Sequence, residues 1–169
     1  MKQAIAGVSP EQAGEVTIMI VYPTLAATGL GRFLGRLYAS RIGFGGIFTL
    51  GTLWIAVTIP IALALFFAML GPGLARRYRL TNRRLVVDEG MKQTPGKQVT
   101  LDNFDEIDIE VLPGQAWYPA GDMIFRKGKM ETFRLSGVSR PESFKQVCLK
   151  AQRAHTMVAS AMKLQPAAV

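Results

Sequence analysis

The residue types best suited to nucleophilic catalysis are one cysteine and one histidine, seven positions apart. Cys148 and His155 lie in the stretch SRPESFKQVCLKAQRAHTMV, whose apolar spacing predicts a helix. Seven helical residues span about 10 Å, so the two side chains are not expected to act as a nucleophile and its base. Cys148 is expected to pack in the core. We therefore predict no catalytic residues and a protein that is not an enzyme, with an enzyme of membrane lipids as the weaker alternative.

A second pattern that could carry chemistry is a group of five acidic residues. They are Asp102, Asp105, Glu106, Asp108 and Glu110. No glycine-containing loop arranges them around an ion, as a calcium-binding loop would. They are expected instead to form the solvated face of a strand, opposite a basic strand that carries Arg77 and Arg79. We predict no metal ion.

The stretch GLGRFLG is similar to a glycine-rich nucleotide-binding loop. Its spacing is G-x-G-x-x-x-G rather than G-x-G-x-x-G, and no β-α-β unit surrounds it. Gly31 and Gly35 are four residues apart, which favours close packing of helices in a membrane. Neither a nucleotide nor any other cofactor is expected.

The strongest candidate for a binding site is the basic stretch GPGLARRYRLTNRRLVVDEG. It contains Arg76, Arg77, Arg79, Arg83 and Arg84. At the least these arginines mark the cytoplasmic end of a membrane segment. They are also expected to attract anionic lipid headgroups, each contributing about 1 kcal/mol near the surface. The predicted lipid-headgroup site also includes three basic residues at a later turn, namely Arg126, Lys127 and Lys129.

The whole chain carries a formal net charge of +8 over 169 residues, with a sequence pI of about 10. Such a charge indicates an anionic partner, which could be nucleic acid, anionic lipid or an acidic protein surface. The sequence has neither a recognition helix nor the interleaved aromatic residues of single-strand binders, so nucleic acid is not expected. The single cysteine excludes an internal disulfide and is compatible with a reducing compartment.

The distribution of charge predicts a membrane segment. The 29 residues from Ile42 to Leu70 carry no charge. As a continuous helix they would be about 43 Å long, more than the ~30 Å hydrocarbon core requires. Pro60 is expected to kink or break that helix. A transmembrane or re-entrant segment over residues 42–72 is therefore predicted, with a single span, two spans and a re-entrant hairpin left open.

The segment before this run, residues 16–41, is predicted to be amphipathic and close to the membrane. It is apolar and β-branched up to Tyr22, and then shows the helical spacing of Leu30, Phe33, Leu34 and Leu37. Arg32 and Arg36 lie on another face of that helix. The pattern fits a helix in the headgroup layer and also the end of a first membrane helix. Arg32, Arg36, Trp117 and Tyr118 are the predicted contacts with the membrane interface or a partner.

The orientation follows from the basic residues. The first fifteen residues do not fit a secretion signal and are predicted to be a flexible cytoplasmic tail. The arginines after Leu70 place the remainder of the chain in the cytoplasm by the positive-inside rule. Because Arg32, Arg36 and Arg41 precede the apolar run, basic residues flank it on both sides. This arrangement favours an even number of crossings, or none completed.

From Arg77 the pattern changes to short alternating stretches separated by turn residues, typical of an antiparallel β domain. Six strands are predicted, in the stretches RYRLT, RLVVDE, KQVTL, FDEIDIEV, DMIFR and ETFRLS. A helix follows, with Ser139 and Glu142 in a capping-box arrangement and Phe144, Val147, Cys148, Ala151 and His155 on one face. The fold class is therefore α+β, an antiparallel sheet or sandwich capped by a C-terminal helix.

Part of this domain resembles a known family. The residues Tyr78, Leu80, Thr81, Asn82 and Arg84, followed by Gly121-Asp122 and the terminal helix, are similar to the bacterial pleckstrin-homology-like (PH-like) domains of small membrane proteins. The resemblance covers about residues 70–155. It implies a seven-stranded, partly open barrel after one or two hydrophobic segments. The seventh strand is expected from residues 116–118 or from residues 16–22.

These observations predict a PH-like domain over residues 74–158 and a flexible tail over residues 159–169. The expected protein is a non-catalytic binding or scaffolding module on the cytoplasmic face of the bacterial inner membrane, as a subunit of or adaptor to a membrane assembly. The alternative is a sensor that binds anionic lipid through Arg76–Arg84. The expected partners are the bilayer, anionic lipid and a protein partner or second copy of the chain.

Overall fold

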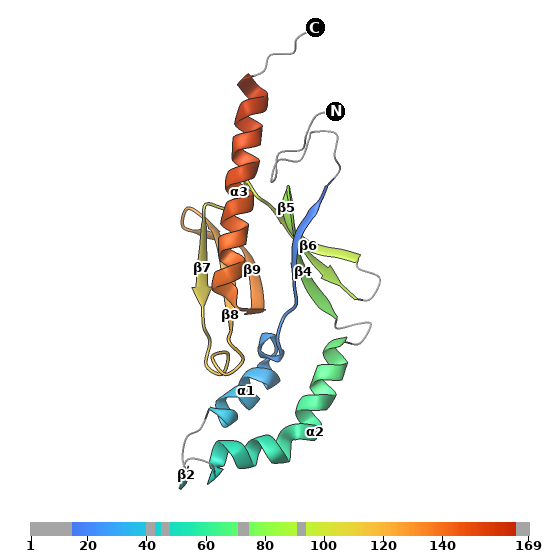
Figure 1. Cartoon of the computed structure of the whole chain (residues 1–169), viewed down its shortest axis with the longest axis vertical. Helices are drawn as coiled ribbons and strands as arrows, with labels where there is room; N and C mark the ends of the chain where they lie inside the picture. Colours follow the sequence, from blue (N-terminus) through green and yellow to red (C-terminus); the bar gives the residue numbers. More distant parts are fainter. Residues whose placement is uncertain (1–14, 40–42, 45–47, 71–74, 91–93, 165–169) are drawn as a thin grey trace.

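The computed structural model describes residues 15–39, 43–44, 48–70, 75–90 and 94–164. Two antiparallel sheets of four and three strands form a β domain, with two helices at one end and a long C-terminal helix along it (Figure 1). The α+β class is confirmed. The predicted flexible tail over residues 1–15 lies outside the described residues except for its last residue.

The larger sheet has the order β1-β4-β5-β6. Its strands are β1 (Thr17–Val21), β4 (Arg76–Thr81), β5 (Arg84–Glu89) and β6 (Thr94–Thr100). The tight turn predicted at Asn82-Arg83 joins β4 to β5. Thr81 stabilises this turn, since its Oγ1 donates to the Arg84 carbonyl at 2.8 Å and accepts from the Arg84 N–H at 3.0 Å.

The smaller sheet has the order β7-β8-β9. It consists of β7 (Glu106–Glu110), β8 (Ala120–Lys127) and β9 (Met130–Ser139). The six strands predicted after Arg76 are all present. The seventh strand is β1, so of the two origins expected for it, residues 16–22 are correct and residues 116–118 are not. The β domain thus draws on residues before the apolar run as well as on residues 74–158.

The core lies between the two sheets and is closed by the helix α3 (Pro141–Leu164). Phe125 packs edge-to-face on Phe104 and Phe133, with ring centroids 5.0 and 5.9 Å apart. Phe144 and Cys148 of α3 are buried against this aromatic group, which confirms the predicted apolar face of the helix.

Both ends of α3 differ from the prediction. Ser139 is the last residue of β9 and Arg140 precedes the helix, so the helix begins one residue later than a cap at Ser139 would require. At the other end the helix runs to Leu164, past the predicted tail boundary at residue 158. Its last turns extend beyond the sheets (Figure 1).

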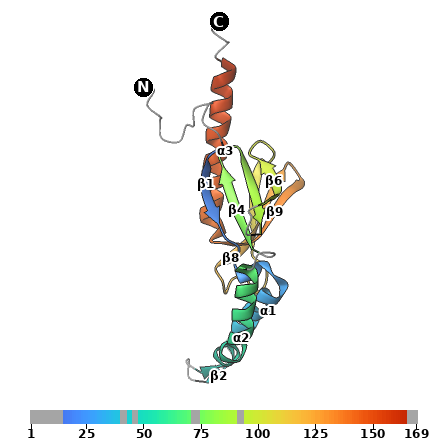
Figure 2. The ribbon, with the colours of Figure 1, turned by 90° about the vertical axis from the view of Figure 1, so that its right-hand side faces the viewer.

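Between β1 and β4 the chain leaves the β domain as a helical hairpin. The first arm contains the short helix η1 (Leu25–Ala27) and α1 (Gly29–Tyr38). The second arm is α2 (Leu50–Leu70). This hairpin lies at the end of the molecule opposite the end of α3 (Figure 2).

The pairing of β1 with β4 fixes the topology of this hairpin. Val21 pairs with Tyr78 and Ile20 with Arg79, in antiparallel register. The chain between them therefore leaves one sheet and returns to the same sheet. A single completed membrane crossing by residues 42–70 is incompatible with this pairing, because it would separate the two strands by a bilayer.

The apolar run is not one continuous helix. Its glycine-rich beginning forms a small β pair, β2 (Gly43–Phe44) with β3 (Phe48–Thr49), and α2 starts only at Leu50. Pro60 lies in the middle of α2, which is bent halfway along its length (Figure 1). Within the described part of the chain, none of the helices combines the length and the apolar character needed to cross a membrane.

Two glycines of α1 allow close contacts, Gly31 with η1 and Gly35 with the β domain. A Cβ on Gly31 would lie 2.0 Å from the Leu25 carbonyl oxygen, and one on Gly35 would lie 2.2 Å from the Gly114 carbonyl oxygen. Gly114 belongs to the loop of residues 111–119 between β7 and β8, the β7–β8 loop. The sequence favoured packing of these glycines on a second membrane helix. That prediction is wrong for the described contacts, in which they face the backbone of Leu25 and Gly114.

A buried carboxylate connects the hairpin to the smaller sheet. Asp122 Oδ1 accepts from Gln115 Nε2 at 2.6 Å and from the Gly137 N–H at 2.9 Å. The Gly137 carbonyl in turn accepts from the Thr24 N–H at 2.9 Å. Because Gln115 lies in the β7–β8 loop and Thr24 precedes α1, Asp122 positions both segments that hold α1 in place.

We expect Gly137→Ala to destabilise the protein more than Gly128→Ala. Both glycines have positive φ, +63° and +59°. A Cβ on Gly137 would lie 2.4 Å from the Ala27 nitrogen, whereas a Cβ on Gly128 meets nothing within 4 Å. The φ strain costs about 1 kcal/mol in each variant, and the clash adds about 2 kcal/mol at Gly137.

Urea unfolding of the full chain in non-ionic detergent measures the difference between these variants. Equal losses of stability would show that η1 does not pack on β9.

Candidate functional site

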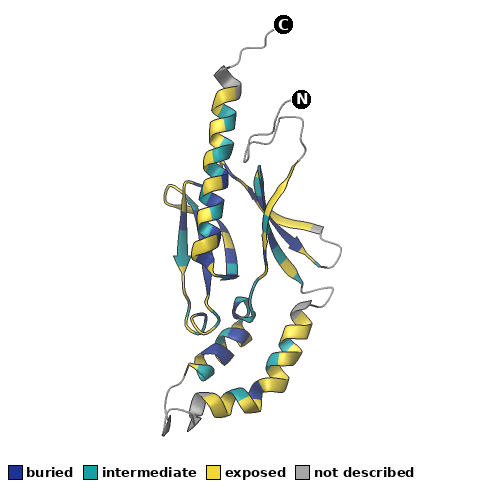
Figure 3. Ribbon diagram, in the orientation of Figure 1, coloured by how far each residue is buried: buried dark blue, intermediate teal, exposed yellow. Residues whose placement is uncertain are grey.

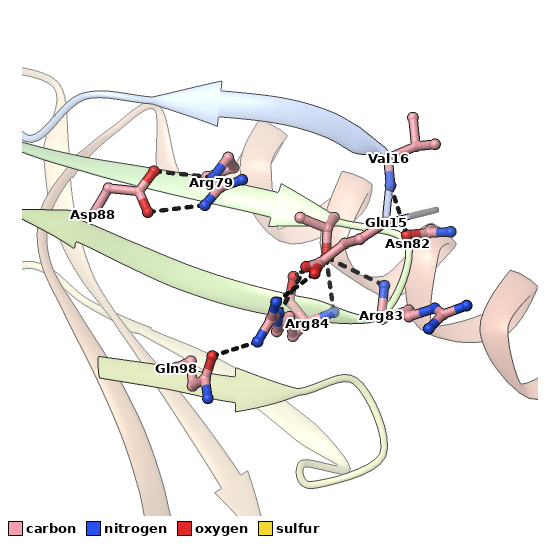
Figure 4. Close-up of polar contacts among 9 residues, drawn as sticks. Glu15, Val16, Arg79, Asn82, Arg83, Arg84, Asp88 and Gln98 are labelled. Carbon is pink, nitrogen blue, oxygen red and sulfur yellow. Dashed lines mark hydrogen bonds and ion pairs between the residues drawn. The ribbon is translucent and has the colours of Figure 1, made fainter. Parts of the chain in front are cut away.

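The predicted basic cluster is divided between the two ends of β4. Arg76 begins the strand next to the hairpin, whereas Arg83 and Arg84 lie at the turn beyond Thr81 (Figure 4). Six residues of strand span about 20 Å, so these arginines do not act on one surface point. Only the Arg76 end faces the α1–α2 hairpin (Figure 1).

Two of the arginines are engaged by a buried carboxylate. Asp88 of β5 has a fully buried side chain. Its Oδ2 accepts from Arg77 Nε at 3.0 Å and from Arg79 Nε at 2.9 Å, and its Oδ1 accepts from Arg79 Nη2 at 3.0 Å. The hydrogen bond to Asp88 raises the pKa of Arg79. Asp88 thus binds both Nε and Nη2 of Arg79, whereas in the described contacts it binds Arg77 through Nε alone.

Arg84 is also paired internally. Its Nε donates to Glu15 Oε1 at 2.7 Å and its Nη1 to Gln98 Oε1 at 2.8 Å (Figure 4). The hydrogen bond from Arg84 lowers the pKa of Glu15. Arg83, at the same turn, is exposed. This end of the sheet is basic but lies far from the hairpin.

The three other predicted headgroup contacts lie at the β8–β9 turn. Arg126 Nε is 2.7 Å from Asp108 Oδ2, and Lys127 Nζ is 3.3 Å from the Asp102 carbonyl oxygen. Lys129 is exposed. Since β8 begins beside the β7–β8 loop at the hairpin end, its last residues lie at the opposite end. These residues therefore do not extend the basic region around Arg76.

The predicted interface residues are brought together at α1. Trp117 stacks edge-on against Tyr38 with ring centroids 5.7 Å apart and remains 45% exposed. Tyr118 packs on Gly35, and its hydroxyl is buried without a hydrogen-bond partner among the described residues. Arg36 is exposed and Arg32 half-buried on the same helix.

The acidic group does not face Arg77 and Arg79, so that part of the prediction is wrong. β7 pairs with β8, and Asp108 forms an ion pair with Arg126. Glu110 Oε2 lies 3.2 Å from Arg134 Nη1. Among the described residues, no three His, Cys, Asp or Glu side chains gather as metal ligands would.

The cysteine and histidine have separate environments. Cys148 is fully buried in the core, and burial raises the pKa of its thiol to about 12. His155 Nδ1 lies 3.1 Å from Asp102 Oδ1, near the surface. The described contacts thus give Cys148 no base, and its thiol is protonated at neutral pH.

The surface of α2 is strongly apolar although it lies outside the core. Large hydrophobic side chains are exposed around the helix, from 44% for Trp54 to 66% for Val57. They are Leu53, Trp54, Val57, Ile59, Ile61, Leu63, Phe66 and Phe67. The half-buried and buried positions of α2 are few, as the burial colouring shows (Figure 3). Exposure of so much apolar surface on one helix to water is unfavourable.

A hydrogen bond between two hydroxyl groups joins the arms of the hairpin. Tyr38 of α1 and Thr58 of α2 approach to 2.6 Å between their hydroxyl oxygens. Thr58 Oγ1 also donates to the Trp54 carbonyl at 2.6 Å, so the Tyr38 hydroxyl is the donor in the first contact. The hydroxyl groups of Tyr38 and Thr58 are thereby paired between the arms, while the outer surface of α2 is apolar.

A cavity of about 640 Å³ lies where the hairpin meets the larger sheet. Its lining is mostly apolar and comes from five separate segments. The lining residues are Tyr22, Pro23, Thr24, Leu25, Phe66, Ala75, Arg76, Arg77, Gly90 and Tyr118. Sequence reasoning found Arg76, Arg77 and Tyr118 as separate candidates but missed the cavity, because no local pattern links these segments.

Comparisons with known proteins add no assignment. No family model, no curated protein and no solved structure matches the chain.

We expect Asp88→Asn to cost about 2 kcal/mol of unfolding free energy, because two arginine side chains lose their buried charged partner. Glu131→Gln is the control, since Glu131 pairs with Arg134 at the surface and should contribute little to stability. Urea unfolding at pH 7 compares the two. A cost for Asp88→Asn no greater than the control would exclude a structural role for the Asp88 network.

We also expect stability to fall as the pH rises above 9. The pKa of Cys148 increases from 9.0 to about 12 on folding, so the folded state retains a proton that the unfolded state releases. Its contribution is complete below pH 9 and is lost by up to about 1.4 kcal/mol per pH unit up to pH 12. Tyr78, whose pKa burial raises to about 12, adds a similar loss above pH 10.

The free energy of unfolding of wild type and Cys148→Ala, measured at pH 8, 9 and 10, distinguishes the contribution of Cys148 from that of Tyr78. The variant should lose most of the slope between pH 9 and 10. An unchanged slope would mean that Cys148 ionises normally in the folded protein.

Proposed function

We propose that this chain is a non-catalytic binding module held on a membrane by its α1–α2 hairpin, with the β domain in the cytoplasm. The observation that carries the proposal is the exposure of uncharged, bulky side chains around α2, such as Val57 at 66% and Phe67 at 61%. Transfer of each such side chain out of water contributes about 1.5 kcal/mol or more. A bilayer provides that environment on all sides of a helix.

The form of the hairpin supports membrane insertion without passage to the far side. Its two ends join β1 and β4 of one sheet, so both must be on the same side of the bilayer. Basic residues lie on the first arm, at Arg32 and Arg36 of α1, and after the second arm, at Arg76. Under the positive-inside rule this common side is the cytoplasm. The Tyr38–Thr58 hydrogen bond satisfies polar atoms that hydrocarbon could not.

The architecture of the β domain supports a PH-like module. Four- and three-stranded antiparallel sheets enclose one core, and a C-terminal helix packs into it. The residues that carry the family resemblance have structural roles here. Thr81 holds the β4–β5 turn, and Asp122 joins the β7–β8 loop to β9. A domain of this kind fits a scaffold that presents surfaces rather than a reaction centre.

A second candidate, contact with a protein partner, is favoured by the outer face of β1. Val16, Ile18 and Ile20 are 48%, 48% and 41% exposed, whereas Met19 and Val21 of the same strand pack in the core. Since β1 is an edge strand of its sheet, this apolar stripe is open to a partner chain or a second copy. The double variant Ile18→Lys/Ile20→Lys should then reduce co-purification or self-association without changing membrane binding.

The membrane proposal predicts that full-length chain sediments with membranes and resists extraction by high salt. The double variant Val57→Lys/Phe67→Lys should shift to the supernatant, because each charge costs about 3 kcal/mol in the centre of a membrane helix. Met157→Lys, at a 69% exposed position on α3, is the matched control and should remain with membranes. A wild-type chain that stays in the soluble fraction as a monomer without detergent contradicts the proposal.

A further inference from the structure

We propose that the cavity between the hairpin and the larger sheet binds one molecule of an anionic phospholipid. Its phosphate would lie at Arg76 and Arg77, and one hydrocarbon chain would occupy the space lined by Leu25 and Phe66. This inference rests on the proposed membrane association and adds a defined ligand site to it. The site differs from the basic patch expected from the sequence, because it excludes the arginines at the far end of β4.

The cavity has the size and lining of a ligand site. Its volume of about 640 Å³ falls within the range of about 300–1,000 Å³ typical of small-molecule pockets. Most of its lining is apolar or aromatic, including Tyr22, Pro23 and Ala75 besides the two residues already named. A hydrocarbon chain satisfies such a lining, whereas a sugar or a nucleotide base would leave polar groups unpaired there.

The charged edge of the cavity suits a phosphate. The Arg77 side chain is 20% exposed, and its Nε is fixed by Asp88 at 3.0 Å. That contact orients the guanidinium plane and leaves its Nη donors for a ligand. Arg76 is more exposed, with 58% of its side chain accessible and its Nε 3.5 Å from Glu89 Oε1. Consecutive residues of a strand project to opposite faces, so Arg76 and Arg77 border the cavity separately. A guanidinium group with unused nitrogens can offer paired hydrogen bonds to phosphate oxygens.

Tyr118 closes the cavity on the side of the β7–β8 loop. Its hydroxyl is buried with no hydrogen-bond partner among the described residues, and solvent does not reach it. Tyr118 therefore contributes wall area, and the polar contacts of the ligand are assigned to Arg76 and Arg77.

The position of the cavity identifies the bilayer as the source of its ligand. Phe66 lines the cavity and is also part of the exposed apolar surface of α2, with 47% of the residue exposed. The cavity is therefore continuous with the surface that the proposed function places in hydrocarbon. Arg76 begins β4, the next element after α2, so it would lie near the level of the lipid phosphates. A lipid can thus enter with its headgroup still in the interfacial layer.

The test uses full-length protein in nanodiscs of phosphatidylcholine that contain small amounts of phosphatidylglycerol. Native mass spectrometry counts the phosphatidylglycerol molecules retained per chain. Wild type should retain one, and Arg76→Gln should bind it about tenfold more weakly. Arg83→Gln is the matched control, because it removes the same charge from the exposed turn at the other end of β4 and should change binding by less than about twofold.

A second variant tests the apolar part of the cavity. Ala75→Phe places a larger side chain in the lining and should abolish retention while the circular dichroism spectrum and membrane sedimentation stay as in wild type. Glycerol phosphate, added as a soluble headgroup, should not displace the lipid. Displacement by glycerol phosphate, or equal effects of Arg76→Gln and Arg83→Gln, would overturn the proposal.

The two proposals fail separately. If the wild-type chain sediments with membranes but retains no phosphatidylglycerol, the cavity assignment is wrong and membrane association stands. If it does not sediment with membranes, the proposed function itself is wrong.

Discussion

The antiparallel pairing of β1 with β4 is the constraint on which the other features depend. These strands are far apart in the sequence, and the whole apolar hairpin lies between them. Their hydrogen bonds require the chain to return to its starting point after α2. That return sets the orientation of the hairpin and forms the junction cavity. It also means that the nonpolar surroundings favoured by the exposed side chains of α2 must begin beside the β domain.

The contacts around Asp122 make the junction specific. A buried carboxylate that accepts from Gln115 and from the Gly137 N–H holds a loop and a strand at once. The loop supports α1 through Gly114, and the strand supports the start of the hairpin through Thr24. Since burying such a group without partners would be costly, its two hydrogen bonds favour this one arrangement of hairpin and β domain.

The basic character of the chain has two different uses in the fold. Arg79 and Arg84 are paired with Asp88 and Glu15, and these contacts stabilise the larger sheet. Arg76 and the outer nitrogens of Arg77 remain beside an apolar cavity at the hairpin end. The net charge of the chain therefore overstates how many basic side chains can contact an anionic ligand. The position of each arginine relative to a carboxylate separates the two groups.

The sequence alone was sufficient for the features that depend on local periodicity. Alternation located β4–β9, helical spacing located α1 and the core face of α3, and the absence of charge located the apolar run. Features that depend on contacts between distant segments required the tertiary structure. Examples are the β1–β4 pairing, the capture of Arg77 and Arg79 by Asp88, and the cavity. The physical reason is that a side chain's partners across a sheet or a junction leave no periodic signal in the chain itself.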